Sequence, residues 1–304
     1  MHCWIRNRFP VTRRRADHAC RLRCLLAAVL MVCAFGGGAA QAAARTLTYF
    51  PVGPIYDYRW KVLALALDHV RQAGGPAFDL RPYAESVTQN RGISLLQAGT
   101  IDVIALGTNT ERESRMLPIK VDISRGVIGY RVFLISASDQ DRIARLDDEA
   151  FRTQLTFGMN SQWADLPVMR ANGYTVVTTT DYERLFDMLA ARRFDALPRG
   201  IGEAAIELDA RRDSFPDLAI EQTRALYFPY PIYFWVSRDN KQLAGWIEQG
   251  LRAALADGSL RKLFESYHAP MMKALAQSRR HVIRLDNPVL PAGSAPVDTK
   301  WWWR

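Results

Sequence analysis

The sequence contains few cysteines, and all of them lie near its start. They are Cys3, Cys20, Cys24 and Cys33. The chain beyond residue 33 can therefore form neither a disulfide nor a cysteine-ligated metal site. That part of the chain has to be stabilised by an apolar core alone.

Long apolar runs are also missing. The longest, at residues 25–35, is far shorter than the ~20 residues that a membrane-spanning helix needs. An arginine-rich segment precedes it, and small residues ending at 40–44 follow it, which is the pattern of a secretory signal peptide. We therefore expect residues 1–43 to be a Sec-type signal peptide and the protein to act in the periplasm.

The excess of positive charge is concentrated in the same leader. Of the formal net charge of +9, residues 1–42 contribute seven arginines and one aspartate, which leaves about +3 for the rest. A nucleic-acid-binding surface requires a stronger basic excess than this. We expect no nucleic-acid partner.

Sequence motifs of common catalytic sites are absent. There is no nucleophilic serine elbow and no phosphate-binding loop. The histidines His69, His268 and His281 have no partners at the spacing of metal ligands. We therefore predict no metal site, no cofactor and no catalytic residues.

What the chain does contain is an alternation of strand and helix patterns after the leader. This alternation is typical of a parallel α/β sheet. The first unit consists of predicted strands at 46–50, 78–83 and 101–106, with helices at 58–73 and 88–98. Gly99 follows the second helix at the position of a C-terminal capping glycine.

A second unit of the same kind begins after residue 154. Between the two units, residues 108–126 show no periodicity and 127–136 form a long apolar strand pattern. The second unit consists of strands at 155–159 and 174–177, each followed by a helix, the first opening at Ser161 and the second at Asp181. Further elements are predicted at 202–211 (helix), 218–220 (strand), 241–256 (helix) and 260–269 (helix), with an aromatic run at 227–235.

Two α/β units joined by two extended segments, near 127 and 232, predict two lobes with a hinge. We expect lobe 1 to comprise 45–128 plus 234–272, and lobe 2 to comprise 129–233. Residues 273–304 are expected to be an irregular tail on the surface or partly disordered. A cleft between such lobes is the natural place for a ligand.

Several segments resemble the periplasmic solute-binding proteins of the amino-acid type, family 3. The resemblance covers roughly residues 45–270. Its carriers are the segments Leu95–Val103, Leu106–Arg112, Arg193–Ala196 and Ala256–Leu260. It implies a type II periplasmic-binding fold, in which each of two lobes is a mostly parallel sheet flanked by helices and two segments form the hinge.

The resemblance also implies functional positions. Arg112 matches the family's arginine that grips a ligand carboxylate, although it stands in a charged run and could be an ordinary surface residue. The family's acidic residue that grips the ligand ammonium is replaced here by Arg199, which reverses the charge preference of that position. Glu203 could neutralise Arg199 or supply the missing acidic contact itself.

Other candidates follow from their places at strand ends or in the aromatic run. Trp163 and Asp165 follow a strand end, where they could contact a ligand, or could simply pack on the lobe and complement a helix dipole. The remaining predicted ligand-binding residues are Tyr56, Thr108, Tyr230 and Tyr233.

The resulting hypothesis is a monomeric periplasmic binding protein that closes on a small polar or anionic solute. Its partner would be an ABC permease or a membrane sensor. Two alternatives remain open: a dehydratase-like enzyme on the same fold with Glu203 as general acid, and an interaction protein without a ligand.

Overall fold

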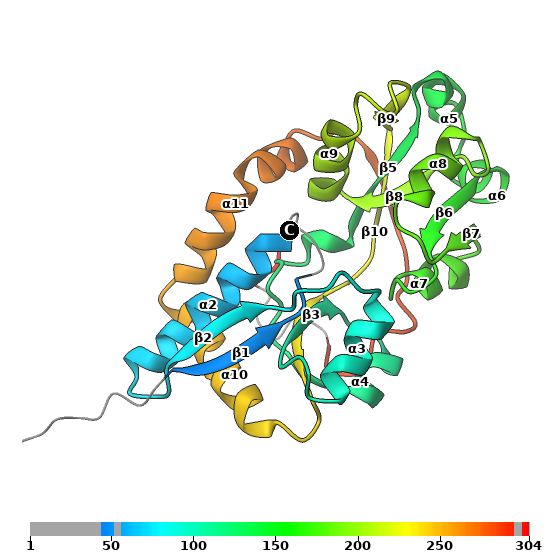
Figure 1. Ribbon diagram of the computed structural model, residues 1–304. Coiled ribbons are helices and arrows are strands. Elements are labelled where there is room, and N and C mark those ends of the chain that lie inside the picture. Colours follow the sequence, from blue (N-terminus) through cyan, green and yellow to red (C-terminus); the bar gives the residue numbers. More distant parts are fainter. Residues whose placement is uncertain (1–43, 52–55, 295–299, 304) are drawn as a thin grey trace, which may run out of the picture. The chain divides into compact units, whose positions relative to one another are not determined.

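The computed structural model describes residues 44–51, 56–294 and 300–303 of the chain (Figure 1). The expected signal peptide lies outside these residues. In this part of the chain, no helix combines the length and the apolar character that crossing a membrane requires.

The first lobe is built on strands from both ends of the chain. Its strands are β1 (Arg45–Tyr49), β2 (Phe78–Pro82), β3 (Ile104–Gly107), β4 (Leu117–Ile119) and β11 (Ile232–Val236). β1 runs parallel to β2, and a bridge between Tyr49 and Val103 brings β3 alongside. β11 runs antiparallel to both β3 and β4. The sheet is therefore mixed, because the chain enters it through β11 on its return from the second lobe.

Helices cover this sheet, and all but the shortest of them bury apolar side chains. They are α2 (Asp57–Gln72), α3 (Gln89–Gln97), α4 (Thr110–Arg115), α10 (Lys241–Ala256) and α11 (Ser259–Ala276). Figure 1 shows α2 and α10 packed side by side, and Gly250 is the reason they can approach so closely. A Cβ at Gly250 would lie 1.9 Å from the carbonyl oxygen of Ala66.

The predicted C-terminal capping role of Gly99 agrees with its backbone conformation, since its φ is +73° directly after the end of α3.

The second lobe has a central strand, β5 (Tyr130–Ser136), whose every residue is buried. It runs antiparallel to β8 (Leu197–Gly200), β9 (Leu218–Ile220) and β10 (Arg224–Tyr227). β6 (Thr156–Asn160) and β7 (Thr175–Thr179) pair in parallel, and a bridge from Phe157 to Ala196 connects β6 with the residue just before β8.

Short helices flank the second lobe. They are α5 (Gln140–Ala144), α6 (Asp148–Gln154), α7 (Leu166–Ala171), α8 (Arg184–Ala190) and α9 (Ile201–Ala210), with the 3₁₀ turns η2 (Val127–Gly129) and η3 (Ala137–Asp139). Phe133, Phe151 and Phe157 pack against one another at the centre, with ring centroids 5.1–5.8 Å apart. The predicted α/β class is therefore correct, but both sheets are mixed.

Three local predictions need correction. The helix expected to open at Ser161 begins at Leu166, because residues 161–165 form a turn in which the side chain of Asn160 accepts from the backbone N–H of Gln162. Residues 108–126, where the sequence shows no periodicity and no element was predicted, contain α4 and β4. The strand expected from 127 starts at Tyr130, after η2.

The tail is also more ordered than the sequence predicted. α11 continues through Pro270 to Ala276, and β12 (His281–Arg284) pairs in parallel with β10. Beyond β12 the tail contacts both lobes: Asn172 bonds the backbone of Asp286, and Thr110 bonds the backbone of Val289. Residues 281–290 are therefore a strap that joins the lobes.

The indole rings near the end of the chain pack against the segment that leads into the second lobe. Trp301 is 4% exposed and donates through Nε1 to the carbonyl of Asp122 at 2.7 Å. The Asp122 carboxylate in turn accepts from the backbone of Ile232 and Gly126, each at 2.8 Å. These contacts place Trp301 at the point where both connections between the lobes meet.

We expect Trp301→Phe to lower the free energy of unfolding by about 1–3 kcal/mol, because it leaves the buried carbonyl of Asp122 without its donor. Urea unfolding measures the change. Trp303→Phe is the matched control, since Trp303 is only partly buried and packs edge-on against Tyr130. Equal losses in the two variants would contradict a specific role for the indole N–H of Trp301.

Candidate functional site

Polar side chains from both lobes converge on a cavity of about 50 Å³. The ends of β3 and β8, the start of α2 and the turn after β6 all contribute to its walls. This is the edge of the sheets where ligands bind in α/β proteins. Its lining residues are Tyr56, Arg59, Gln89, Leu106, Gly107, Arg112, Ile128, Arg131, Trp163, Ala164, Asp165, Arg199, Glu203, Tyr230 and Ile232.

Arg112 is held in this cavity by backbone and amide oxygens. The side chain of Asn109 caps α4 by accepting from the backbone N–H of Arg112. This cap holds Arg112 in the first turn of α4, with the Arg112 side chain toward the cavity. The guanidinium donates to the carbonyl of Gly107 at 2.8 Å, to Oε1 of Gln89 at 2.9 Å and to the carbonyl of Gln162 at 3.1 Å. The side chain therefore links the two lobes.

Arg112 has no carboxylate partner within ion-pairing distance among the described residues. It is only 5% exposed, and burial lowers its pKa from the ordinary value. A buried cation without a counter-charge is costly unless a ligand neutralises it.

Arg59 is a second cation of this kind. It donates from Nη1 to the carbonyl of Ala105 at 2.8 Å, and its guanidinium lies 4.1 Å from the ring centroid of Tyr56. Burial lowers its pKa as well. It too forms no ion pair in the described part of the chain.

Arg131, in contrast, is neutralised. It projects from β5, is 5% exposed, and pairs with Asp165 at 2.7 Å and with Glu203 at 3.5 Å. Its Nε has no hydrogen-bond partner. The Asp165 carboxylate therefore serves this ion pair, and Asp165 makes no side-chain cap for α7.

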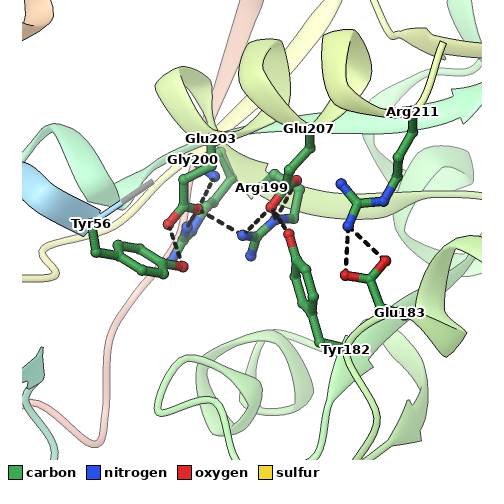
Figure 2. Close-up of polar contacts among 9 residues, drawn as sticks. Tyr56, Tyr182, Glu183, Arg199, Gly200, Glu203, Glu207 and Arg211 are labelled. Atoms are coloured by element: carbon green, nitrogen blue, oxygen red, sulfur yellow. Dashed lines mark hydrogen bonds and ion pairs between the residues drawn. The ribbon is translucent and has the colours of Figure 1, made fainter. Parts of the chain in front are cut away.

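Arg199 is neutralised by two carboxylates of α9, as Figure 2 shows. Its Nε donates to Glu207 at 2.8 Å, and Nη2 lies 3.4 Å from Glu203. Burial lowers the pKa of Arg199, but these two carboxylates outweigh it and hold the pKa well above the ordinary value. Its guanidinium also lies 4.6 Å from the ring centroid of Trp163.

Glu203 is the point where the groups of both lobes meet. Its carboxylate accepts from the backbone N–H of Gly200 at 3.0 Å and from the hydroxyl of Tyr56 at 3.3 Å. Burial raises the pKa of Glu203, but the nearby guanidinium groups of Arg199, Arg131 and Arg59 overcome this and lower it to about 2. The side chain is therefore ionised near neutral pH.

The charges of the cluster do not cancel. Four arginines, Arg59, Arg112, Arg131 and Arg199, face three carboxylates, those of Asp165, Glu203 and Glu207. The cluster carries one uncompensated positive charge, shared between Arg59 and Arg112. All three carboxylates are already engaged by arginine.

The structure brings together most of the predicted site residues. Tyr56, Arg112, Trp163, Asp165, Arg199, Glu203 and Tyr230 line the cavity. Thr108 and Tyr233 do not: the Thr108 hydroxyl bonds Glu113, and the Tyr233 hydroxyl bonds the carbonyl of Ser294 at 3.0 Å.

Sequence reasoning missed Arg59, Gln89, Arg131 and Glu207. A signal existed for Arg131, a lone charge inside the apolar run 127–136. Arg59 and Glu207 lie on helices, where a charged residue is ordinary. No set of three or more His, Cys, Asp or Glu side chains suited to a metal ion occurs among the residues that the structure describes.

No family model and no curated protein matches the sequence. Solved structures do match. An ancestral arginine-binding protein bound to arginine is 15% identical, over 75% of this chain and 99% of that one, with a TM-score of 0.53. The VFT2 domain of BvgS from Bordetella pertussis is 19% identical, over 75% and 94%, with a TM-score of 0.54.

A third similar structure is an ancestral amino acid-binding protein described as a precursor of cyclohexadienyl dehydratase. It is 13% identical, over 74% of this chain and 94% of that one, with a TM-score of 0.52. These likenesses show that the chain has the two-lobe type II periplasmic-binding fold, which confirms the predicted fold class.

Proposed function

We propose that this chain is a divergent solute-binding protein of family 3 that binds a small carboxylate lacking an ammonium group. The observation that carries the proposal is the uncompensated charge of Arg112 in a cavity between the lobes. A guanidinium is suited to a carboxylate, which it can bind through two parallel hydrogen bonds. The fold supports binding between two lobes.

The absence of an amino group in the ligand follows from the charge balance. A zwitterionic amino acid needs a carboxylate for its ammonium as well as a cation for its carboxylate. Asp165 and Glu203 are the acidic residues that line the cavity, and both are ion-paired with arginine. A monoanion complements the single uncompensated charge, whereas a zwitterion does not.

Binding is favoured over catalysis by the state of Glu203. A general acid must hold a proton near the working pH, and the pKa of Glu203 lies at about 2. Its carboxylate is also occupied by a helix-capping hydrogen bond and two ion pairs. The dehydratase alternative therefore has no proton donor at this position.

The proposed setting is the periplasm, with the protein as a monomer that delivers its solute to an ABC permease or a membrane sensor. The similar structures include an arginine-binding protein, which supports a small-molecule ligand and leaves the permease and the sensor as alternative partners. Closure would be driven by the higher affinity of the ligand for the closed arrangement.

A thermal-shift screen with matched ligand pairs tests the proposal. Each pair consists of an amino acid and the carboxylate that lacks its amino group, such as alanine and propionate. A ligand at a hundred times its dissociation constant stabilises the native state by roughly 2.7 kcal/mol, which raises Tm by a few degrees. We expect shifts with the carboxylates alone. Equal shifts with the amino acids, or none with any carboxylate, would overturn the proposal.

A further inference from the structure

A second cavity adjoins the charged one and has the opposite character. It measures about 80 Å³ and is lined mainly by apolar side chains of α9, α11 and the segment 123–128. Tyr56, Arg59, Ile128, Glu203 and Ile232 line both cavities. The two spaces therefore share a wall that includes Arg59 and Glu203, and the rest of the second cavity is lined mainly by apolar side chains.

The far end of the second cavity carries no charge near neutral pH. His268, on α11, and Tyr58 are the titratable residues there: burial lowers the pKa of His268 to about 4 and raises the pKa of Tyr58 well above its ordinary value, so both are neutral. The His268 ring packs against the rings of Tyr58 and Phe264, with centroids 4.6 Å apart in each case. An apolar group in this space would meet hydrocarbon and aromatic surface.

An apolar side chain on the wall of the second cavity is exposed to solvent. Ile206 of α9 lines this cavity and is 50% exposed. Among the described residues, the exposed large apolar or aromatic side chains are Ile206 and, at 41%, Tyr267. A ligand in the cavity would remove part of the Ile206 surface from water, which is favourable.

Each of the two cavities has room for a different part of a small ligand. The charged cavity of about 50 Å³ has room for little more than a carboxylate group. The apolar cavity of about 80 Å³ is roughly half as large as a 150 Å³ cavity that accommodates benzene. It therefore suits a short aliphatic group of roughly three carbons better than an aromatic ring.

We infer that the protein selects short-chain aliphatic carboxylates, with the carboxylate on Arg112 and Arg59 and the alkyl chain in the apolar cavity. The inference rests on the proposed function and adds the ligand's apolar part. Arg59 lines both cavities and so lies where the two parts of the ligand join. The charged groups fix the carboxylate, and the apolar cavity sets the chain length.

The first test is a calorimetric titration of the purified protein with acetate, propionate, butyrate, pentanoate and benzoate. Burial of each methylene should lower Kd about fourfold. We expect Kd to fall from acetate to butyrate and then to level off, with benzoate binding more weakly than butyrate. A Kd that does not depend on chain length would overturn this inference and leave the proposed function standing. Failure of every carboxylate, acetate included, would overturn both.

The second test fills the apolar cavity. Gly202 and Met271 both line the cavity, and a Cβ at Gly202 would lie 2.8 Å from Sδ of Met271, so Gly202→Val adds side-chain volume to the cavity wall. We expect the ratio of the acetate Kd to the butyrate Kd, about sixteen in the unmodified protein by the same methylene increment, to fall toward one. The matched control is Gly245→Val on α10, where a Cβ meets nothing within 4 Å. An unchanged ratio in a folded Gly202→Val variant would count against the inference.

Discussion

Substitution of Arg112 by alanine is expected to weaken binding of the carboxylate ligand by about 10- to 150-fold, the equivalent of a charged hydrogen bond worth about 1.5–3 kcal/mol. The ligand would lose one of the two cavity arginines that form no ion pair in the described part of the chain, the other being Arg59. Calorimetric titration with the tightest ligand of the screen measures the change.

The same substitution should cost the unliganded protein little stability. The three oxygens that Arg112 contacts are uncharged, and two of them belong to Gly107 and Gln89, which line the cavity, where water can replace the guanidinium. Arg115→Ala is the matched control: it lies on the same helix and pairs with Glu111 at 3.5 Å on the surface. If Arg112→Ala bound the ligand as tightly as Arg115→Ala, Arg112 would not be the carboxylate contact.

Substitution of Glu207 by alanine is expected to lower the free energy of unfolding by about 3–5 kcal/mol. Glu207 is 1% exposed and Arg199 is 3% exposed, so the change leaves a buried guanidinium without its main partner. Glu203 remains 3.4 Å from Arg199 and offsets part of the loss, which favours the lower end of the range. Tyr182 also loses the acceptor of its hydroxyl.

Two further variants test whether the loss of stability in Glu207→Ala comes from leaving a buried charge unpaired. Glu183→Ala breaks the ion pair with Arg211, in which Glu183 is 69% exposed, and should cost less than about 1 kcal/mol. Replacing the pair together, as Arg199→Met with Glu207→Leu, should recover much of the stability, because no unpaired charge stays buried. Urea unfolding curves of all the variants measure these changes in the free energy of unfolding. A Glu207→Ala loss no larger than that of Glu183→Ala would show that the buried pair is not structurally important.

The Glu207 contact changes how the arginine at position 199 is understood. The sequence raised two interpretations, an anion contact for a ligand or a partner of Glu203. The geometry shows that Glu207 binds it most closely and that Glu203 is the more distant partner. The charge of Arg199 is therefore balanced by two carboxylates of α9, and we propose that Arg199 shapes the cavity wall beneath Trp163.

The elements of the fold could be predicted from the sequence because they depend on neighbours along the chain. Apolar spacing located α2, α3 and α10 to within a few residues, and Gly99 marked the end of α3. The start of α7 was missed because a turn stabilised by the Asn160 side chain delays the helix. β12 was missed because a short strand shows no pattern apart from its partner, β10.

By itself the sequence determined the α/β class, the order of the main strands and helices of each unit, and the place of Arg112 after a strand end. Only the tertiary structure decided which charged side chains of the cavity form ion pairs and which do not. Arg131 meets Asp165 across 34 residues, and Trp301 meets Asp122 across 179. Periodicity along the chain records which face of an element is buried, but the pairing of charges depends on where separate elements come together in space. The net charge of the cavity, and with it the proposed ligand, follows from that packing.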